Sequence, residues 1–66
     1  MKNRLKIERA IHDLTQEELA EKIGVSRQTI NSIEKNRYIP STLLSLKISK
    51  VFDKPVNELF ELEADD

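Results

Sequence analysis

Side chains that can form directed hydrogen bonds are concentrated between residues 27 and 37. If residues 27–35 form a helix, Ile30 and Ile33 share one face and pack inward, so the polar side chains point outward. An arginine can donate two hydrogen bonds to O6 and N7 of guanine, and glutamine or asparagine can pair with N6 and N7 of adenine. The segment therefore predicts a base-reading surface made of Arg27, Gln28, Thr29, Asn31 and Ser32.

Arg27 and Gln28 are the first candidates in this set, whereas Thr29 and Asn31 also fit an ordinary solvated surface. Donors on either side of the segment can hold phosphate groups. The first position of an expected helix at residue 16 offers unsatisfied backbone N–H groups to an anion. The candidate phosphate contacts are Gln16, Lys35, Asn36, Arg37 and Tyr38. Lys35 and Arg37 are also consistent with ordinary surface charge that keeps the protein soluble, and Tyr38 is also consistent with packing against the protein.

Local signals predict two short helices that position these side chains. Thr15 and Glu18 form a capping box that starts a helix at residue 16, and Gly24 can adopt the positive φ that ends it. Ser26 is the next N-cap and starts a helix that ends near residue 35 or 36. Ala20 is small enough for the two helices to pack closely. This arrangement is typical of a helix-turn-helix, whose second helix fits a DNA major groove about 12 Å wide.

The remaining segments predict three more helices. Residues 2–12 favour an amphipathic helix, with a strand as the alternative at the extreme N-terminus; its apolar residues are Leu5, Ile7, Ala10 and Ile11. A helix after Ser41 ends near residue 53, and its apolar side consists of Leu43, Leu44, Leu46, Ile48, Val51 and Phe52. Pro55 opens a short helix whose buried side is Val56, Leu59 and Phe60.

We therefore expect an all-α fold, a compact bundle of about five short helices in one domain over residues 1–66, with the helix-turn-helix at 16–35. Residues 1–52 carry a net charge of +4, and residues 53–66 carry −5. This split is compatible with a polyanion bound to the basic part, although the acidic end at 61–66 also fits simple solvation.

Composition excludes several classes of protein. The 66 residues include no cysteine, and no stretch approaches the roughly 20 apolar residues of a membrane span. No secretion signal is visible, so we expect a cytoplasmic protein without a membrane partner. His12 is the sole imidazole and is interpreted as a surface residue. With no nucleophile at a suggestive spacing, we expect no enzyme, metal, cofactor or small-molecule substrate.

The segment QEELAEKIGVSRQTINSIEKN (16–36) resembles the Cro/repressor type (XRE family) of bacterial and phage helix-turn-helix regulators, and the resemblance extends from Leu5 to Phe60. It implies a lambda-repressor-like fold and base contacts at Arg27, Gln28 and Ser32. The ends of short stand-alone members can pair as a small antiparallel ribbon, for which residues 1–4 and 60–64 are the candidates here. It also implies a phosphate contact at Gln16 and a structural ion pair between an arginine of the first helix and a glutamate of the recognition helix. The two residues that fall on these positions are Arg9 and Glu34.

The resemblance further implies a regulator of transcription, a repressor by the habit of the family, that binds double-stranded DNA as a homodimer. Two copies related by a two-fold axis would place their recognition helices about 34 Å apart on a palindrome. Leu43 and Leu44 are the candidate dimer or partner surface, because family members are often more polar there and one of the two leucines is therefore expected to be exposed. The alternative function is a protein-interaction module on the same scaffold, such as an antitoxin or a transcription adaptor.

Overall fold

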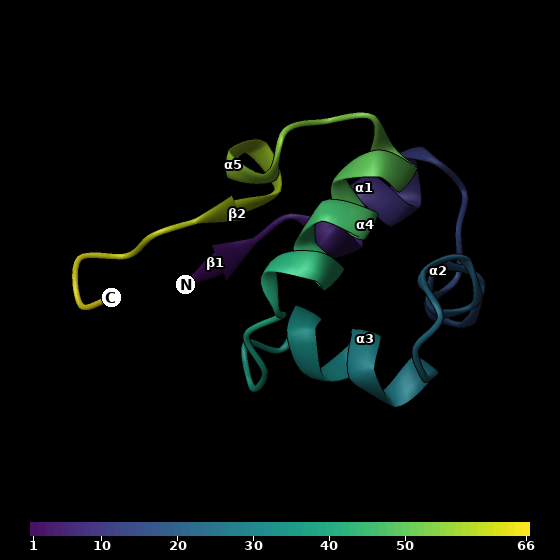
Figure 1. The fold of residues 1–66 in the computed structure, drawn as a ribbon, viewed down its shortest axis with the longest axis horizontal. Helices are drawn as coiled ribbons and strands as arrows, with labels where there is room; N and C mark the ends of the chain where they lie inside the picture. The colour runs from purple at the N-terminus through teal and green to yellow at the C-terminus, as the bar shows by residue number, and fades with distance from the viewer.

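Five short helices and a two-stranded ribbon make up the fold of the computed structural model, which describes residues 1–66 (Figure 1). In chain order the elements are β1 (Lys2–Asn3), α1 (Leu5–Ile11), α2 (Gln16–Ile23), α3 (Arg27–Glu34), α4 (Thr42–Phe52), α5 (Val56–Leu59) and β2 (Phe60–Glu61). The predicted all-α bundle with a short terminal ribbon is confirmed. None of these helices has the length and apolar character needed to cross a membrane.

Side-chain caps set the limits of α2 and α3, as the sequence predicts. The Thr15 hydroxyl accepts a hydrogen bond from the Glu18 backbone at 3.0 Å, and the Glu18 carboxylate accepts one from the Thr15 backbone at 2.9 Å. Gly24 ends α2 in the left-handed conformation with φ of 74°, which glycine adopts without a Cβ penalty. The Ser26 hydroxyl then accepts from the Thr29 backbone at 3.1 Å and starts α3.

The α3 helix ends at Glu34, and Asn36 turns the chain with φ of 59°. Asparagine tolerates this left-handed conformation better than most residues, since its short side chain can hydrogen-bond locally. Arg37 has no positive φ, and its backbone N–H donates to the Ser32 carbonyl at 2.9 Å. The left-handed conformation of this turn therefore falls on Asn36, and the backbone of Arg37 does not require glycine.

The core forms where all five helices meet. Its buried apolar residues are Leu5, Leu19, Ala20, Ile23, Ile30, Ile33, Leu44, Ile48, Phe52, Leu59 and Phe60. Phe60 lies in β2 rather than on the last helix, and Pro55 caps α5 rather than forming its first residue. These two differences shorten α5 to a single turn and leave residues 60–61 extended.

The α1 helix buries a different face from the one that its apolar spacing predicts. Ile7 and Ile11 are 48% and 64% exposed, whereas Glu8 is 1% exposed beside the buried Leu5. The inward face of α1 meets the segment before α5, where Lys54 Nζ lies 2.7 Å from Glu8 Oε2. An ion pair from a distant segment therefore stabilises an acid at a position that the sequence pattern assigns to solvent.

The ribbon joins the two ends of the chain. Lys2 pairs with Glu61 and Asn3 with Phe60 in antiparallel register, so α1 begins at residue 5 rather than residue 2. The Asn3 side-chain amide donates to the Ile33 carbonyl at 2.9 Å and to Asn36 Oδ1 at 3.0 Å. The ribbon is thus tied to the C-terminal end of α3.

Candidate nucleic-acid interface

The α2 and α3 helices pack against each other across a connection of three residues, 24–26. Ala20 is 2% exposed, and the Val25 backbone N–H donates to the Ala20 carbonyl at 3.0 Å. In Figure 1, α3 lies along the lower edge of the molecule with α2 at its N-terminal end. This placement leaves one long side of α3 without a covering element.

The two faces of α3 are divided as the sequence predicts. Ile30 and Ile33 are at most 1% exposed, which confirms their place in the core. Arg27 and Gln28 are exposed, and the other three base-reading candidates are half-buried: Thr29, Asn31 and Ser32. The Thr29 hydroxyl lies 3.0 Å from the Ser26 hydroxyl, so it takes part in the cap of the helix.

A bidentate ion pair holds the end of α3 against α1. Arg9 Nε and one terminal nitrogen donate to the two carboxylate oxygens of Glu34 at 2.6 and 2.9 Å. The side chains are 14% and 7% exposed, and the hydrogen bonds to the carboxylate raise the pKa of Arg9 above its ordinary range. A further donor of the guanidinium binds the Leu14 carbonyl at 3.0 Å, which joins the turn before α2 to the pair.

The Gln16 side chain does not project freely toward solvent. Its Nε2 atom lies 3.2 Å from Glu34 Oε1 and 3.3 Å from Asn31 Oδ1, so the amide bridges the start of α2 to α3. The donors that remain for an anion at this point are the backbone N–H groups of Gln16 and Glu17, since that of Glu18 donates to the Thr15 hydroxyl. The side chain of Gln16 is thus engaged within the protein, and only its backbone N–H is free at the start of α2.

Two open grooves bring the candidate residues together. One runs beside α3 and includes Gln28 and Ser32 together with Arg37 and Tyr38 of the following loop. The other, at the N-terminal ends of α2 and α3, includes both Gln16 and Arg27. Lys35 and Asn36 are exposed on the same connection, and Asn36 also accepts the hydrogen bond from Asn3. Each groove thus contains both base-reading and phosphate-binding candidates, and we refer to all of these candidates together as the surface around α3.

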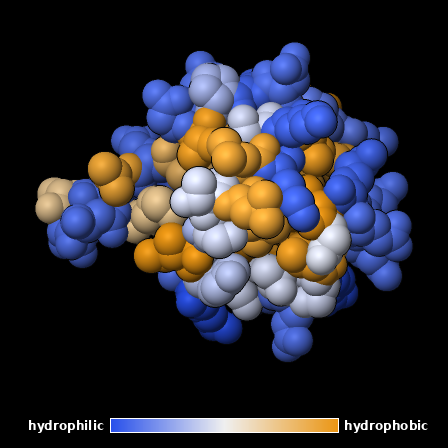
Figure 2. All heavy atoms as spheres, viewed as in Figure 1, coloured by the Kyte–Doolittle hydropathy of each residue, from blue (hydrophilic) through white to orange (hydrophobic).

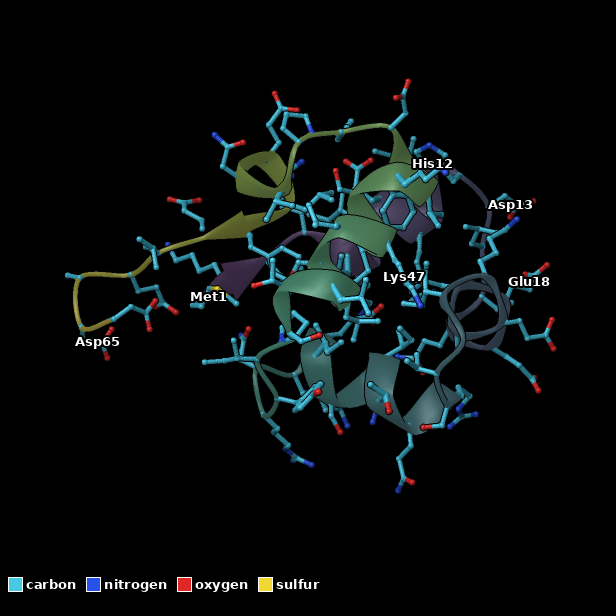
Figure 3. All side chains as sticks on the ribbon, viewed as in Figure 1. Met1, His12, Asp13, Glu18, Lys47 and Asp65 are labelled. Carbon is cyan, nitrogen blue, oxygen red and sulfur yellow. The ribbon has the colours of Figure 1, made fainter.

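A larger groove between α2 and α4 includes His12, Lys22, Lys47 and Lys50. Figure 3 shows Lys47 in the space between these two helices. None of the base-reading candidates lines this groove, so it is separate from the surface around α3. His12 is exposed as the sequence predicts, with its ring 5.1 Å from that of Phe52.

Comparisons with known proteins agree with this geometry. A family described as Helix-turn-helix matches residues 5–59. The chain belongs to this helix-turn-helix family. It is 54% identical to an uncharacterized HTH-type transcriptional regulator of Methanocaldococcus jannaschii over the full length of both chains. It is also 49% identical to one of Bacillus subtilis over 96% of each chain, and 47% identical to one of Archaeoglobus fulgidus over 91% of this chain and 86% of the relative.

Away from the helix-turn-helix, the structure separates the two leucines that the sequence assigns to one partner surface. Leu44 is 7% exposed and belongs to the core, so its assignment to a surface is wrong. On an α-helix adjacent residues point about 100° apart, so only one of the pair can face inward. Leu43 is 64% exposed, and Ile39 and Leu46 are exposed with it. Figure 2 shows apolar residues on this side of the molecule, which carries α4.

Sequence reasoning missed the role of Asn3 in this helix-turn-helix. Its hydrogen bonds to the end of α3 exist only because the ribbon brings β1 to that point. The sequence around Asn3 does not predict these hydrogen bonds, since its partners lie 30 and 33 residues away. The bridge made by Gln16 was missed for the same reason, because it depends on how α2 crosses α3.

Proposed function

We propose that this protein is a sequence-specific regulator of transcription that binds double-stranded DNA and acts as a repressor. The observation that supports this most directly is the orientation of α3. Arg27 and Gln28 are exposed at its start, while the buried pair of Arg9 and Glu34 fixes its end. A rigid helix with outward arginine and amide side chains suits the major groove, where these groups can pair with guanine and adenine.

The residues around α3 supply the contacts that would hold it in the groove. The backbone at Gln16 and the side chains of Lys35, Asn36, Arg37 and Tyr38 would bind phosphates on both sides of the groove. These contacts fix the register of the protein but do not depend on base sequence. Arg27, Gln28 and Ser32 are the principal base readers, with Thr29 and Asn31 beside them.

We also propose that the regulator is a homodimer on a palindromic operator and that residues 1–66 form a single domain. Leu43 and Leu46 are 64% and 56% exposed and lie three residues apart on α4, so two large apolar side chains on one face favour burial against a second copy. A two-fold axis would place the two α3 helices one helical turn apart, about 34 Å. We place its action in the cytoplasm of a prokaryotic or phage-infected cell.

A second candidate function is a protein-interaction module that uses this scaffold to hold another protein, such as an antitoxin or a transcription adaptor. The exposure of Leu43 favours this reading as well, because an unpartnered leucine on α4 suits a protein surface of either kind. Under this alternative, α3 would not select one DNA sequence from a mixture.

Selection from a random library of double-stranded DNA at about 150 mM salt tests the proposal, because this ionic strength suppresses attraction to bulk phosphate. We expect an inverted repeat with half-sites about one turn apart. The double variant Arg27→Ala/Gln28→Ala should lose the enrichment. The matched control Lys50→Ala/Asn57→Ala removes one positive charge and one amide from exposed positions outside α3 and should retain it. Absence of any enriched sequence would favour the protein-interaction module.

A further inference from the structure

A series of hydrogen bonds runs from the ion pair of Arg9 and Glu34 to Asn31, one of the base-reading candidates on α3. These hydrogen bonds fix the orientation of the Asn31 side chain. Both oxygens of Glu34 accept hydrogen bonds from Arg9. A guanidinium has only hydrogen-bond donors, so both oxygens of Glu34 act as acceptors in this pair. The side chain of Glu34 is 7% exposed, and solvent has little access to disturb this state.

The side-chain amide of Gln16 is the next group in this series of hydrogen bonds. Its Nε2 atom lies 3.2 Å from Glu34 Oε1, and a carboxylate can be approached at that distance only by a donor. The nitrogen end of the amide must therefore face α3. The same nitrogen lies 3.3 Å from Asn31 Oδ1, so its two hydrogens serve two acceptors. Asn31 must in turn present its oxygen to Gln16.

This chain of constraints decides which end of Asn31 is available to a ligand. The Oδ1 atom is directed toward Gln16, and the Nδ2 group, with two hydrogens, is the end left for DNA. An asparagine that pairs with adenine needs both ends at the base edge, since it accepts from N6 and donates to N7. Asn31 cannot present both ends while the bridge to Gln16 is intact.

We propose that Asn31 reads its base pair as a hydrogen-bond donor alone and prefers guanine, with Gln16 as the positioning residue that sets this orientation. Guanine offers two adjacent acceptors, O6 and N7, to the two hydrogens of one amide nitrogen. Adenine and thymine each offer one acceptor in the major groove, and cytosine offers a donor there. This inference rests on the proposed function, because it requires that α3 enters the major groove.

The test is a DNA selection with the intact protein and three variants. The position read by Asn31 is the one whose preference changes in Asn31→Asp, and in the wild type it should be guanine. Asn31→Asp keeps the shape of the side chain but presents an acceptor, so the preference should change to cytosine. Gln16→Ala releases the amide, and the preference for guanine over adenine should fall about tenfold at that position alone.

Asn36→Asp is the matched control, because it introduces the same charge on the same surface outside the base-reading set. It should weaken binding to all sequences and leave every base preference unchanged. The inference is overturned if the wild type prefers adenine at the position read by Asn31, or if Gln16→Ala leaves the preference there unchanged. In both cases the enriched operator itself would still support the proposed function.

NMR spectroscopy of the free protein tests the bridge without DNA. The two Nε2 protons of Gln16 should exchange with water more slowly than those of Gln28, an exposed amide one helix away. In Asn31→Ala, the exchange at Gln16 should accelerate. Equal exchange at Gln16 and Gln28 in the wild type would overturn the inference, whether or not the selection finds an operator.

Discussion

The side-chain amide of Asn3 donates a hydrogen bond to the backbone carbonyl of Ile33 at 2.9 Å, across 30 residues of sequence. Ile33 lies in the last turn of α3, and its carbonyl also accepts a hydrogen bond from the Asn36 backbone N–H at 3.0 Å. The ribbon of β1 and β2 holds Asn3 in place through its pairing with Phe60. The two ends of the chain thus help to position the end of the recognition helix.

We expect Asn3→Ala to lower the free energy of unfolding by about 1 kcal/mol, since one side-chain donor to a partly buried carbonyl is lost. Urea unfolding followed by circular dichroism measures this change. DNA affinity should fall equally for all sequences, because Asn3 touches no base reader. A change of base preference in this variant would contradict the structural role of Asn3.

Removal of one partner of the ion pair should be far more damaging than removal of both. Arg9→Ala leaves the Glu34 carboxylate, 7% exposed, without its guanidinium, and we expect a loss of about 3 kcal/mol of unfolding free energy. The double variant Arg9→Met/Glu34→Leu replaces the pair with apolar side chains and should recover most of this loss. Chemical denaturation of the three proteins provides the comparison. A double variant no more stable than Arg9→Ala would contradict this account.

The capping box of α2 should make stability depend on pH. Hydrogen bonds from Thr15 lower the pKa of Glu18 below its ordinary value of 4.5. A lowered pKa means that the carboxylate contributes stability above pH 4.5, and the contribution is lost as pH falls through the folded-state pKa. We expect the wild type to exceed Glu18→Gln in melting temperature at pH 7, and the gap to shrink as the pH falls below 4.5. A gap that persists unchanged at pH 3 would assign the effect to another group.

Arg37 and Arg27 should affect binding in different ways. Arg37→Ala removes a proposed phosphate contact, so it should weaken binding to all sequences and reduce the slope of log affinity against log salt by about one. Arg27→Ala should instead relax the preference at one base position. Fluorescence anisotropy titrations at several salt concentrations separate the two effects. An equal loss on every sequence in Arg27→Ala would exclude Arg27 as a base reader.

Leu43 and Leu44 should respond differently to substitution. Leu43→Glu places a charge on an exposed position of α4, so we expect the homodimer to dissociate while the monomer stays folded. Leu44→Ala opens a cavity in the core and should cost about 2–4 kcal/mol of unfolding free energy. Analytical ultracentrifugation and urea unfolding distinguish the outcomes. A Leu43→Glu protein that still sediments as a dimer would place the interface elsewhere.

The sequence by itself determined the features that depend on neighbouring residues. Thr15, Glu18, Gly24 and Ser26 set the limits of α2 and α3 through contacts within one helical turn. The spacing of buried residues in α3 then determined which of its side chains face outward. These predictions succeed because caps and turns are local interactions, whose energies are decided before the helices pack.

The tertiary structure alone decided which face of α1 and α4 is buried and what each polar group contacts. Apolar residues occur on more than one side of both helices, so their helical spacing does not show which side is buried. In α4 it cannot tell whether Leu43 or Leu44 faces the core. In α1 it cannot predict that Glu8 is buried and Ile7 exposed. That choice depends on neighbours far along the chain, such as Lys54 for Glu8. The amide of Gln16 is oriented in the same way, by acceptors on α3 that only the packing of the helices brings within hydrogen-bonding distance.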